Sequence, residues 1–445
     1  MSVRQTAEQR PKPFYGWVIV GVMAATGALT MAMGTLNFGL FIRPMGDELG
    51  ISRQLFGWSQ TARQVASAVT SPLIGKLIDR HGSRVLLAFA AAITGLAMVG
   101  LAFMQHGWLL VPLFGVMGLV GMGGPGSLVT AVPVAKWFVR KRGRAMSFMA
   151  LGIPVGGVIF VPLTQLFIDG IGWRWTWVVM AAIGAGLIIP LSLWLVRRHP
   201  EDMGLRPDGD PSPALTAGRD GRRSGRAAPN TDEVSWTVKE AARSPAFWSL
   251  VVVFSLTMLA MSSVGLHRIP HFMDQGLDPR LVAYATALDA LAAGVSTFAL
   301  GMLVDRYPAQ YVGAAGFGLL AFAIYLTIIA DTTALMFAAM LTFGMGVGSL
   351  MLLRNFMIAD YFGRKHLGGI QGVMMPITLV FGGAGAPLAG FIRDAIGTYN
   401  PIWWGGLGLM VAGGALLALT PKPVKGPAAR GTEPPAPVTT AESLR

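Results

Sequence analysis

The sequence contains no cysteine, and only 13% of its residues are charged. Without cysteine the chain can form neither disulfides nor thiolate metal sites. Soluble domains carry about 25% charged residues, so this chain has too few of them to cover a surface in water. Its six histidines show no HExxH spacing, and the ATP-binding pattern GxxxxGKS/T does not occur. These absences predict no metal and no cofactor, and they disfavour a membrane enzyme and an ATP-driven pump.

What the sequence has in excess is apolar residues, which make up 53% of its 445 positions. They form many runs of about 20 residues, the length that a helix needs to cross a hydrocarbon core of about 30 Å. The first run, 17–42, is too long for the core of a signal peptide and predicts a retained span. The fold class predicted is therefore an all-α polytopic membrane protein.

Twelve apolar runs fall into two sets that flank a polar linker. The first set is 17–42, 55–78, 85–104, 108–135, 145–168 and 174–196, and the second is 246–267, 281–304, 309–330, 333–359, 367–392 and 402–420. They predict twelve transmembrane helices in two bundles, with the domains 1–16 (tail), 17–196 (bundle), 197–245 (linker), 246–420 (bundle) and 421–445 (tail). The linker is rich in Pro, Gly, Asp and Arg, which is typical of a flexible segment. Near its end, Thr237 and Glu240 have capping-box spacing and predict a short helix at the membrane surface.

Lysine and arginine are distributed unevenly between the two sides of this topology. With the N-terminus inside, 27 of the 35 basic residues fall in cytoplasmic segments, 6 fall outside, and Arg63 and Arg354 fall within spans. Cytoplasmic loops of membrane proteins carry such an excess of positive charge, so both termini and the linker are predicted to be cytoplasmic. The net charge of +13 is then a signal of topology and gives little support to nucleic-acid binding. The bacterial inner membrane is the expected location.

The two halves of the chain repeat each other at a nearly constant offset. GKLIDRHGSR at 75–84 is answered by GMLVDRY at 301–307, 226 residues later. The other matches are GMG (121–123) with GVG (346–348), WFVRKR (137–142) with YFGRKH (361–366), and PLTQLFID (162–169) with PLAGFIRD (387–394). Parallel repeats of six spans are typical of one large transporter architecture, in which the substrate site lies at the midplane between the halves. The repeat thus predicts a duplicated six-helix unit with a central site.

The sequence resembles the major facilitator superfamily across residues 14–420. Its segment 75–84 matches that superfamily's loop between spans two and three, G-x-L-x-D-R-x-G-x-R. The residues that the resemblance marks as a conformational gate are Gly75, Asp79, Arg80, Gly82 and Arg84, with Asp305 and Arg306 as their repeat. Such a charge cluster can hold one conformation closed and break in another. The alternative is that these residues only anchor the helix ends at the membrane surface.

Within the superfamily the chain is most similar to the bacterial monocarboxylate and oxalate/formate transporters. The segments that carry this similarity are FYGWVIV (14–20), NFGLFIRPM (37–45), HRIPHFMDQGLDP (267–279) and ADYFGRKHLGGIQG (359–372). The chain also departs from that branch. Leu36 stands where a lysine is common in span one, and Thr297 stands where an arginine is common in span eight, although the acid of span eight is present as Asp289. These departures count against assignment as a proton-coupled monocarboxylate transporter and leave the transporter assignment intact.

Arg63 lies deep in the second apolar run, among polar residues at three- and four-residue spacing. A charged residue within a span is costly and usually faces a pathway or a partner. The repeat places Asp289 226 residues later, at the matching depth of span eight. We therefore expect Arg63 to attract an anionic substrate and Asp289 to exchange a proton or hold a basic partner. The alternative is a structural ion pair between the two, or an arginine that extends to the membrane surface.

Three further residues are candidates for the site. Arg354 in span ten could make a second carboxylate contact or extend to cytoplasmic water. His267, with Arg268 and His271, is placed at the outer end of span seven and could relay protons or simply mark the membrane surface. Asn37 in span one could bind substrate or another helix. The glycines Gly121, Gly123, Gly124, Gly126, Gly344, Gly346 and Gly348 are expected to be helix-packing sites.

The function that these features favour is secondary active transport of a small organic anion, with a monocarboxylate as the leading substrate class. The partners expected are that anion, a proton or a counter-anion, and membrane lipid. Two alternatives stay open. One is export of drugs or other hydrophobic compounds, and the other is a membrane sensor that does not transport, which the lack of a signalling domain disfavours.

Overall fold

The computed structural model describes residues 14–33, 37–120, 128–138, 141–197, 200–206, 208, 236–304, 306–363 and 366–423, and over these residues the chain is helical without strands. The first half contains α1 Gly16–Ala32, α2 Phe38–Leu49, α3 Arg53–His81, α4 Ser83–Ala102, η1 Gly107–Leu109, α5 Leu110–Leu119, α6 Leu128–Trp137, α7 Arg142–Ala150 and α8 Gly152–Leu195. The second contains α11 Pro245–Asp274, α12 Pro279–Val304, α13 Ala309–Ile329, α14 Thr333–Phe362, α15 Leu367–Ile396 and α16 Asn400–Leu419. Between them lie the short helices η2 Pro200–Met203 and α10 Val238–Arg243.

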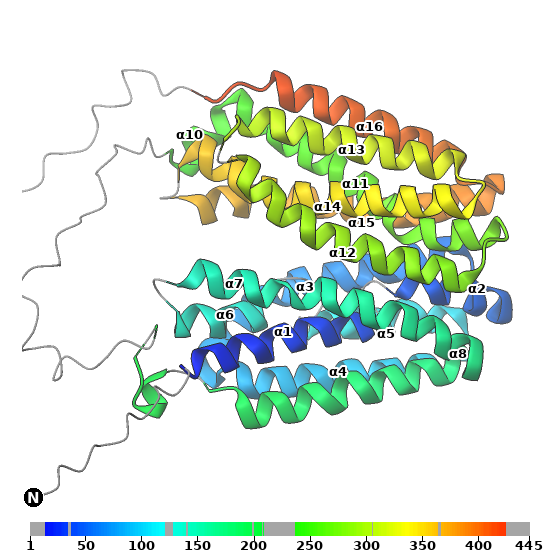
Figure 1. Cartoon of the computed structure of the whole chain (residues 1–445), viewed down its shortest axis with the longest axis horizontal. Coiled ribbons are helices and arrows are strands. Elements are labelled where there is room, and N and C mark those ends of the chain that lie inside the picture. Colours follow the sequence, from blue (N-terminus) through cyan, green and yellow to red (C-terminus); the bar gives the residue numbers. More distant parts are fainter. Residues whose placement is uncertain are drawn as a thin grey trace, which may run out of the picture.

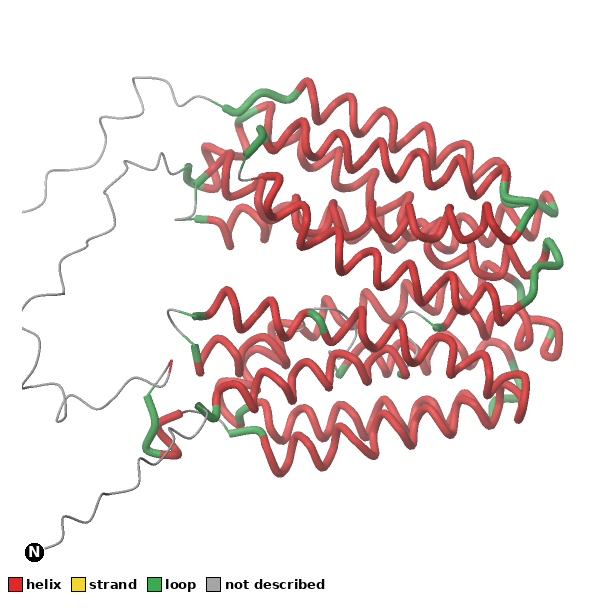
Figure 2. The backbone as a smooth tube through the Cα atoms, viewed as in Figure 1, coloured by secondary structure: helices red, strands yellow, loops and turns green. Residues whose placement is uncertain are grey.

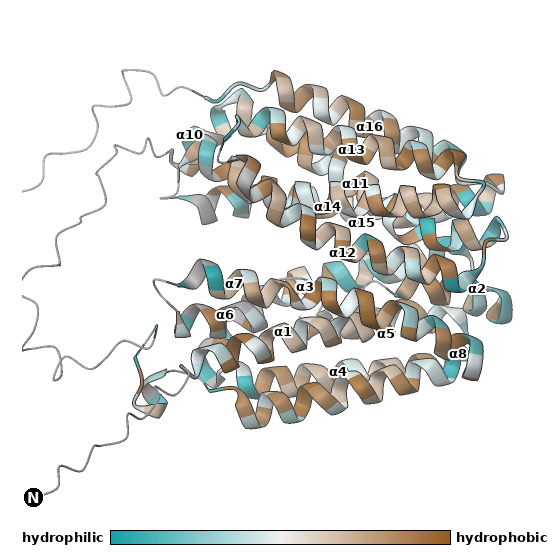
Figure 3. Cartoon of the chain, viewed as in Figure 1, coloured by the Kyte–Doolittle hydropathy of each residue, from teal (hydrophilic) through white to brown (hydrophobic). Residues whose placement is uncertain are grey.

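The described helices account for the twelve predicted spans. Eight of them are long and apolar enough to cross a membrane, and one of these, 144–195, covers two spans. That long helix changes direction at Gly172, whose φ of 79° is open to glycine and strained for other residues. Spans one and four are each built from two shorter helices, α1 with α2 and α5 with α6. Hydrophobic residues dominate these helices, and hydrophilic ones gather toward their ends (Figure 3).

Two spans differ in extent from the prediction. The second helix of span one, α2, extends to Leu49, beyond the predicted end of the span at Ile42. Span seven was predicted to end at His267, yet α11 continues for seven more residues to Asp274 and ends before Gly276, which has φ 84°. The apolar pattern underestimates α11 because the polar residues of its last turns are buried inside the bundle, where they have partners.

The short helix α10 confirms the predicted capping box. The Thr237 hydroxyl accepts the Glu240 N–H at 3.3 Å, and the Glu240 carboxylate accepts the Thr237 N–H at 2.8 Å. Two N–H groups at the start of the helix are thereby satisfied. A backbone hydrogen bond of 2.9 Å from Trp236 N–H to the Phe362 carbonyl joins this segment to the second half.

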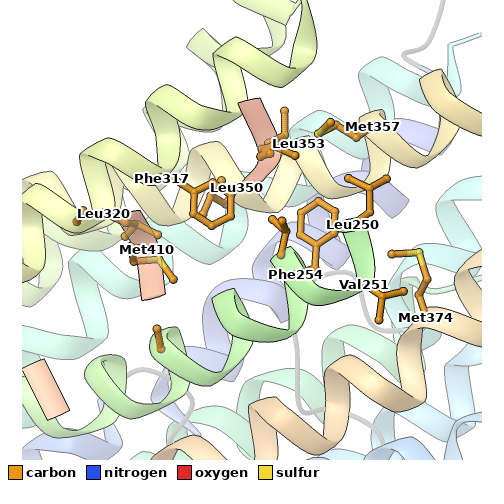
Figure 4. Close-up of a cluster of buried hydrophobic side chains, with 14 of the residues drawn as sticks. Leu250, Val251, Phe254, Phe317, Leu320, Leu350, Leu353, Met357, Met374 and Met410 are labelled. Atoms are coloured by element: carbon orange, nitrogen blue, oxygen red, sulfur yellow. The ribbon is translucent and has the colours of Figure 1, made fainter. Parts of the chain in front are cut away.

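Each half has its own hydrophobic interior. In the second half, buried side chains from the seven helices α10 to α16 form one cluster, part of which Figure 4 shows around Phe254, Phe317 and Leu350. In the first half, Phe41 stacks on Trp177 with ring centroids 4.0 Å apart, within a cluster of buried aromatic and methionine side chains. Association of membrane helices depends on such close packing, because lipid gives little hydrophobic driving force between them.

Equivalent glycines pack the equivalent helices of the two halves. A Cβ added to Gly118 of α5 would lie 2.2 Å from the Arg63 carbonyl oxygen of α3. A Cβ added to Gly344 of α14 would lie 2.1 Å from the Asp289 carbonyl oxygen of α12. The two glycines are 226 positions apart in the sequence, and so are the two residues that they contact, Arg63 and Asp289. The glycine prediction is thus confirmed for Gly344, whereas 121–127 lie outside the described residues.

The two halves lie side by side and meet at one end (Figures 1 and 2). We call this the distal end, and the opposite end, where α1 begins and α16 ends, the terminal end. The helix pairs α3 with α15, α8 with α12 and α2 with α11 form the contact between the halves. Backbones approach closely there: a Cβ added to Gly57 would lie 2.4 Å from the Pro387 nitrogen. Toward the terminal end the ribbons of the two halves diverge (Figure 1).

Gly118 gives a direct test of this packing, because Gly115 on the same helix has no atom within 4 Å of an added Cβ. Gly118→Ala should destabilise the protein by about 1–3 kcal/mol, since the backbone of α3 must move. Gly115→Ala should leave stability unchanged or raise it by up to about 1 kcal/mol through helix propensity. Thermal unfolding of both variants in detergent checks this. Equal melting temperatures for the two variants would show that the close approach is not needed.

Candidate functional site

Arg63 lies in the middle of α3, one of the helices that join the two halves. It stands ten residues after the helix start at Arg53, about 15 Å along the axis at 1.5 Å per residue. Its side chain is buried, with 5% of the residue exposed. Two positions earlier, the Thr61 hydroxyl donates to the Gly383 carbonyl of α15, so this stretch of α3 touches the other half. The structure therefore places a buried guanidinium at mid-depth on an interface helix.

Asp289 occupies the matching place on α12. It stands ten residues after the helix start at Pro279, again about 15 Å along the axis. It is 5% exposed, and α12 packs against α8 of the first half. The expected equivalence in depth between Arg63 and Asp289 is confirmed by these helix positions.

The partner of Asp289 is Arg268 of α11. The two guanidinium Nη atoms of Arg268 donate to the two carboxylate oxygens of Asp289, one of them at 3.4 Å and the other at closer range. The guanidinium also lies over the Phe343 ring of α14, with Cζ 4.0 Å from the ring centroid. Arg268 is 3% exposed, so this is a buried ion pair with an aromatic cover.

This pairing corrects the alternative in which Arg63 and Asp289 neutralise each other. The carboxylate of Asp289 is bound within its own half, by a residue that sequence analysis placed at the outer end of span seven. The continuation of α11 beyond His267 brings Arg268 inside the bundle, six residues before the helix ends. The sequence signal for this pairing was the position of Arg268 in HRIPH, just before the span whose single acid is Asp289.

His267 and Asn37 each bind another helix. The His267 ring approaches the Ala386 carbonyl through Nε2 at 2.9 Å and the Tyr399 hydroxyl through Nδ1 at 3.3 Å. It is fully buried, so it lies inside the bundle and not at an exposed membrane surface. The Asn37 amide donates to the Thr164 hydroxyl at 2.8 Å, which ties the start of α2 to α8. Both residues support helix packing in this conformation.

Arg354 is half-buried on α14, eight residues before the helix ends at Phe362. With Gln371 and Thr378 of α15 it lines a small recess toward the terminal end, whose other walls are Ile358, Met374 and Met375. The recess has about 10 Å³ of free volume, room for roughly one water. Arg354 is remote from the distal contact, and the structure does not bring it together with Arg63 or Asp289 through any described contact.

Part of the predicted gate lies outside the description. For Gly75 and Asp79 the structure describes only the backbone, which belongs to α3. Asp305 lies wholly outside the described residues. Arg80, Arg84 and Arg306 are exposed. Gly82 ends α3 with φ 77°, and its N–H donates to the Ile78 carbonyl at 2.9 Å. A sharp turn between α3 and α4 at the terminal end is therefore present.

The distal end holds charged contacts that sequence analysis did not identify. Arg53 of α3 lies 3.2 Å from Asp274 of α11, and Arg280 of α12 lies 2.7 Å from Asp169 of α8. Each of these pairs joins one half to the other. The sequence signal for Asp169 was the repeated aspartate of PLTQLFID and PLAGFIRD.

A third distal acid, Glu48, is bound within the first half. Trp173 Nε1 donates to one of its oxygens, and the Arg174 guanidinium donates to the other at 2.9 Å. The carboxylate is therefore held within the first half and does not bridge the halves.

Comparison with known proteins gives matches over most of the chain. The sequence profile of the Major Facilitator Superfamily matches residues 22–276 and 269–445. Monocarboxylate transporter 11 of Mus musculus is 23% identical over 416 residues, which cover 88% of this chain and 84% of the relative. Monocarboxylate transporter 13 of Bos taurus is 22% identical over 415 residues, which cover 92% of this chain and 88% of the relative.

Solved structures of transporters share the fold. A bacterial homologue of the human lysosomal transporter Spinster, in an inward-facing and occupied conformation, aligns with a TM-score of 0.63 at 16% identity and covers 92% of this chain and 96% of its own. A D-xylose-proton symporter aligns with a TM-score of 0.65 at 16% identity and covers 92% of this chain and 98% of its own. At such identities the likeness shows the fold and leaves the substrate open.

The pairing of Asp289 can be tested by a double-mutant cycle. Asp289→Asn or Arg268→Gln alone leaves one buried charge without its counter-charge, which costs about 3–5 kcal/mol. The double variant should recover much of this loss, because neither charge remains. Arg63→Gln combined with Asp289→Asn should instead give additive losses. Thermal unfolding in detergent measures these four variants and the single variant Arg63→Gln, and a coupling of Asp289 to Arg63 in place of Arg268 would contradict the assignment.

Proposed function

This chain belongs to the Major Facilitator Superfamily, and on that premise we propose that it moves a small organic anion, with a monocarboxylate as the leading class. Membership makes it an integral membrane transporter of a small molecule and not an enzyme. The names of its relatives, monocarboxylate transporters at 22–23% identity, support the substrate class.

The observation that carries the proposal is the buried guanidinium of Arg63 on an interface helix. A cation in the middle of a membrane-spanning helix costs several kcal/mol, so it is retained where it has a use. A guanidinium presents parallel N–H donors that match the two oxygens of a carboxylate. Arg63 is on a helix that contacts the opposite half, where a site that alternates between the two sides of the membrane must lie. We assign Arg63 to the substrate carboxylate.

Asp289 and Arg268 supply the coupling step in this proposal. When Asp289 takes up a proton, its charge is lost and Arg268 is left with an uncompensated positive charge. The negative charge of a substrate bound at Arg63 then offsets the charge that Asp289 has lost. Release of the substrate and of the proton restores the original ion pair. Exchange of one anion for another at Arg63 would need no proton.

The sidedness follows from the distribution of charge. The terminal end carries most of the basic residues, so the positive-inside rule assigns it to the cytoplasm, with the membrane being the inner membrane of a bacterium. With this assignment the described conformation is closed toward the outside. Export of a hydrophobic drug is disfavoured, because such a compound offers no negative charge to the buried guanidinium of Arg63.

Uptake by the purified protein in liposomes tests the assignment of Arg63. The panel consists of labelled short monocarboxylates and, for any that is transported, its uncharged amide. Arg63→Gln should raise the apparent KM for the carboxylate about tenfold to a hundredfold, because a hydrogen bond to a charged group contributes about 1.5–3 kcal/mol. The amide should be affected much less.

Arg243→Gln serves as the matched control, since it removes a cation from α10 and not from a span. It should leave the KM unchanged. If the parent protein transports none of the carboxylates, the substrate class is wrong. If Arg63→Gln transports carboxylates with the parent KM, or loses the amide to the same degree, Arg63 does not bind the carboxylate.

A further inference from the structure

Two aspartates occupy equivalent positions at the distal end, and each touches the opposite half. Asp169 near the kink of α8 and Asp394 near the end of α15 close the repeated segments 162–169 and 387–394. Asp394 accepts the backbone N–H groups of Arg53 and Gln54 at 3.1 and 2.9 Å. Asp169 accepts the Arg280 Nε at 2.7 Å. Gln54 and Arg280 are themselves 226 positions apart, so the two contacts follow the internal symmetry.

Asp394 acts on α3 as a helix cap that comes from the other half. The first N–H groups of a helix have no partner within it. On α3 the Ser52 hydroxyl accepts the N–H of Leu55 at 3.3 Å, which leaves the N–H groups of Arg53 and Gln54 for Asp394. A carboxylate at this end of a helix is also favoured by the helix dipole. Part of the stability of the start of α3 therefore depends on contact between the halves.

The first turn of α12 explains why Asp169 has a different kind of partner. Pro279 has no N–H, and the Arg280 N–H is already accepted by Asp278 at 2.8 Å. No backbone donor of these two residues is left for a carboxylate from α8. The Arg280 side chain takes that role, and the aspartate at the equivalent position still binds the first turn of the opposing helix. Equivalent aspartates in the two halves thus bind the first turn of the opposing helix, and the backbone donors that are free in that turn decide whether the partner is backbone or side chain.

We infer that Asp169 and Asp394 are positioning residues that hold the starts of α12 and α3 against the opposite half while the distal end is closed. These helices carry Asp289 and Arg63, so the two aspartates act on the site through the helices. Opening the distal end breaks the hydrogen bonds that two backbone N–H groups and one guanidinium make to these carboxylates. Loss of either aspartate shifts the equilibrium toward the distally open state. The inference uses the two conformations of a transporter of this superfamily and does not depend on which substrate is moved.

The absence of cysteine makes the test direct, because labels can be introduced without background. One pair of spin labels at Gln105→Cys and Asp331→Cys reports the distal end, where both positions are exposed in different halves. A second pair at Arg144→Cys and Lys239→Cys reports the terminal end, again at exposed positions. Distance distributions are measured by pulsed electron paramagnetic resonance in the full chain without substrate.

Asp394→Ala should raise the ratio of distally open to distally closed protein by about threefold to thirtyfold, the range expected for loss of a helix cap. Asp169→Ala should raise the same ratio by less, about 1.5-fold to fivefold, because its partner is an exposed side chain. The distal pair gains a longer distance and the terminal pair a shorter one. Glu48→Ala is the matched control, since it removes a distal carboxylate whose partners lie in the same half. It should leave both distributions at the parent values.

Exchange of the charges, Asp169→Arg with Arg280→Asp, keeps the test valid if an alanine variant does not fold. This double variant restores the ion pair and should restore the parent distribution. Unchanged distances in both alanine variants would overturn the inference, and so would an equal shift in Glu48→Ala. Because no substrate is present, the result is independent of the anion proposed above, whose failure would appear only in the uptake assay.

Discussion

A carboxylate buried in a membrane-spanning bundle requires a cation beside it, and the arrangement of the second half follows from that requirement. Asp289 obtains its cation from α11, which must therefore continue as a helix past His267 so that Arg268 faces α12. Gly344 gives α14 a close approach to the backbone of Asp289, and Phe343 covers the guanidinium. Replacing either charge alone would leave the other without compensation in a medium of low polarity.

The two halves share one helix arrangement but carry different charged residues at equivalent positions. Gly118 and Gly344 bring equivalent helices together at Arg63 and Asp289, so a cation and an anion stand at the same depth on the two interface helices. At the distal end, Asp169 and Asp394 bind the starts of those same helices from the opposite half. The charged site and the distal contact thus lie on the same helices, α3 and α12. A rocking motion of one half against the other would change both together.

Most of the helical framework could be predicted from the sequence, because apolar runs, repeats and caps are local signals. The capping box of Thr237 and Glu240, the equal depth of Arg63 and Asp289, and the packing role of Gly344 are examples. The end of α11 could not be predicted in this way, since its last turns carry polar residues that hydropathy assigns to water. The partner of Asp289 depends on how α11 is rotated about its axis, and no local pattern specifies that rotation.

The distal contacts show the same limit. The repeat identified Asp169 and Asp394 as equivalent, yet their partners are set by which half they face and by the donors that each first turn leaves available. Pro279 and Ser52 are visible in the sequence, but their effect on a carboxylate from another helix appears only when the halves are packed. Residue equivalence is therefore easier to predict than residue contact.

The central claim is that an organic anion binds beside Arg63, between the halves, and one labelling measurement tests it most directly. Gln64, which follows Arg63, is half-buried, and its side-chain oxygen lies 3.9 Å from the place of a Cβ at Gly382 of the opposite half. In a chain without other cysteines, Gln64→Cys can be labelled with a small thiol reagent in the presence of short monocarboxylates. The account predicts that a carboxylate slows the labelling at Gln64→Cys, and that this protection disappears when Arg63→Gln is added. Protection that persists without Arg63, or labelling that no carboxylate slows, would contradict it.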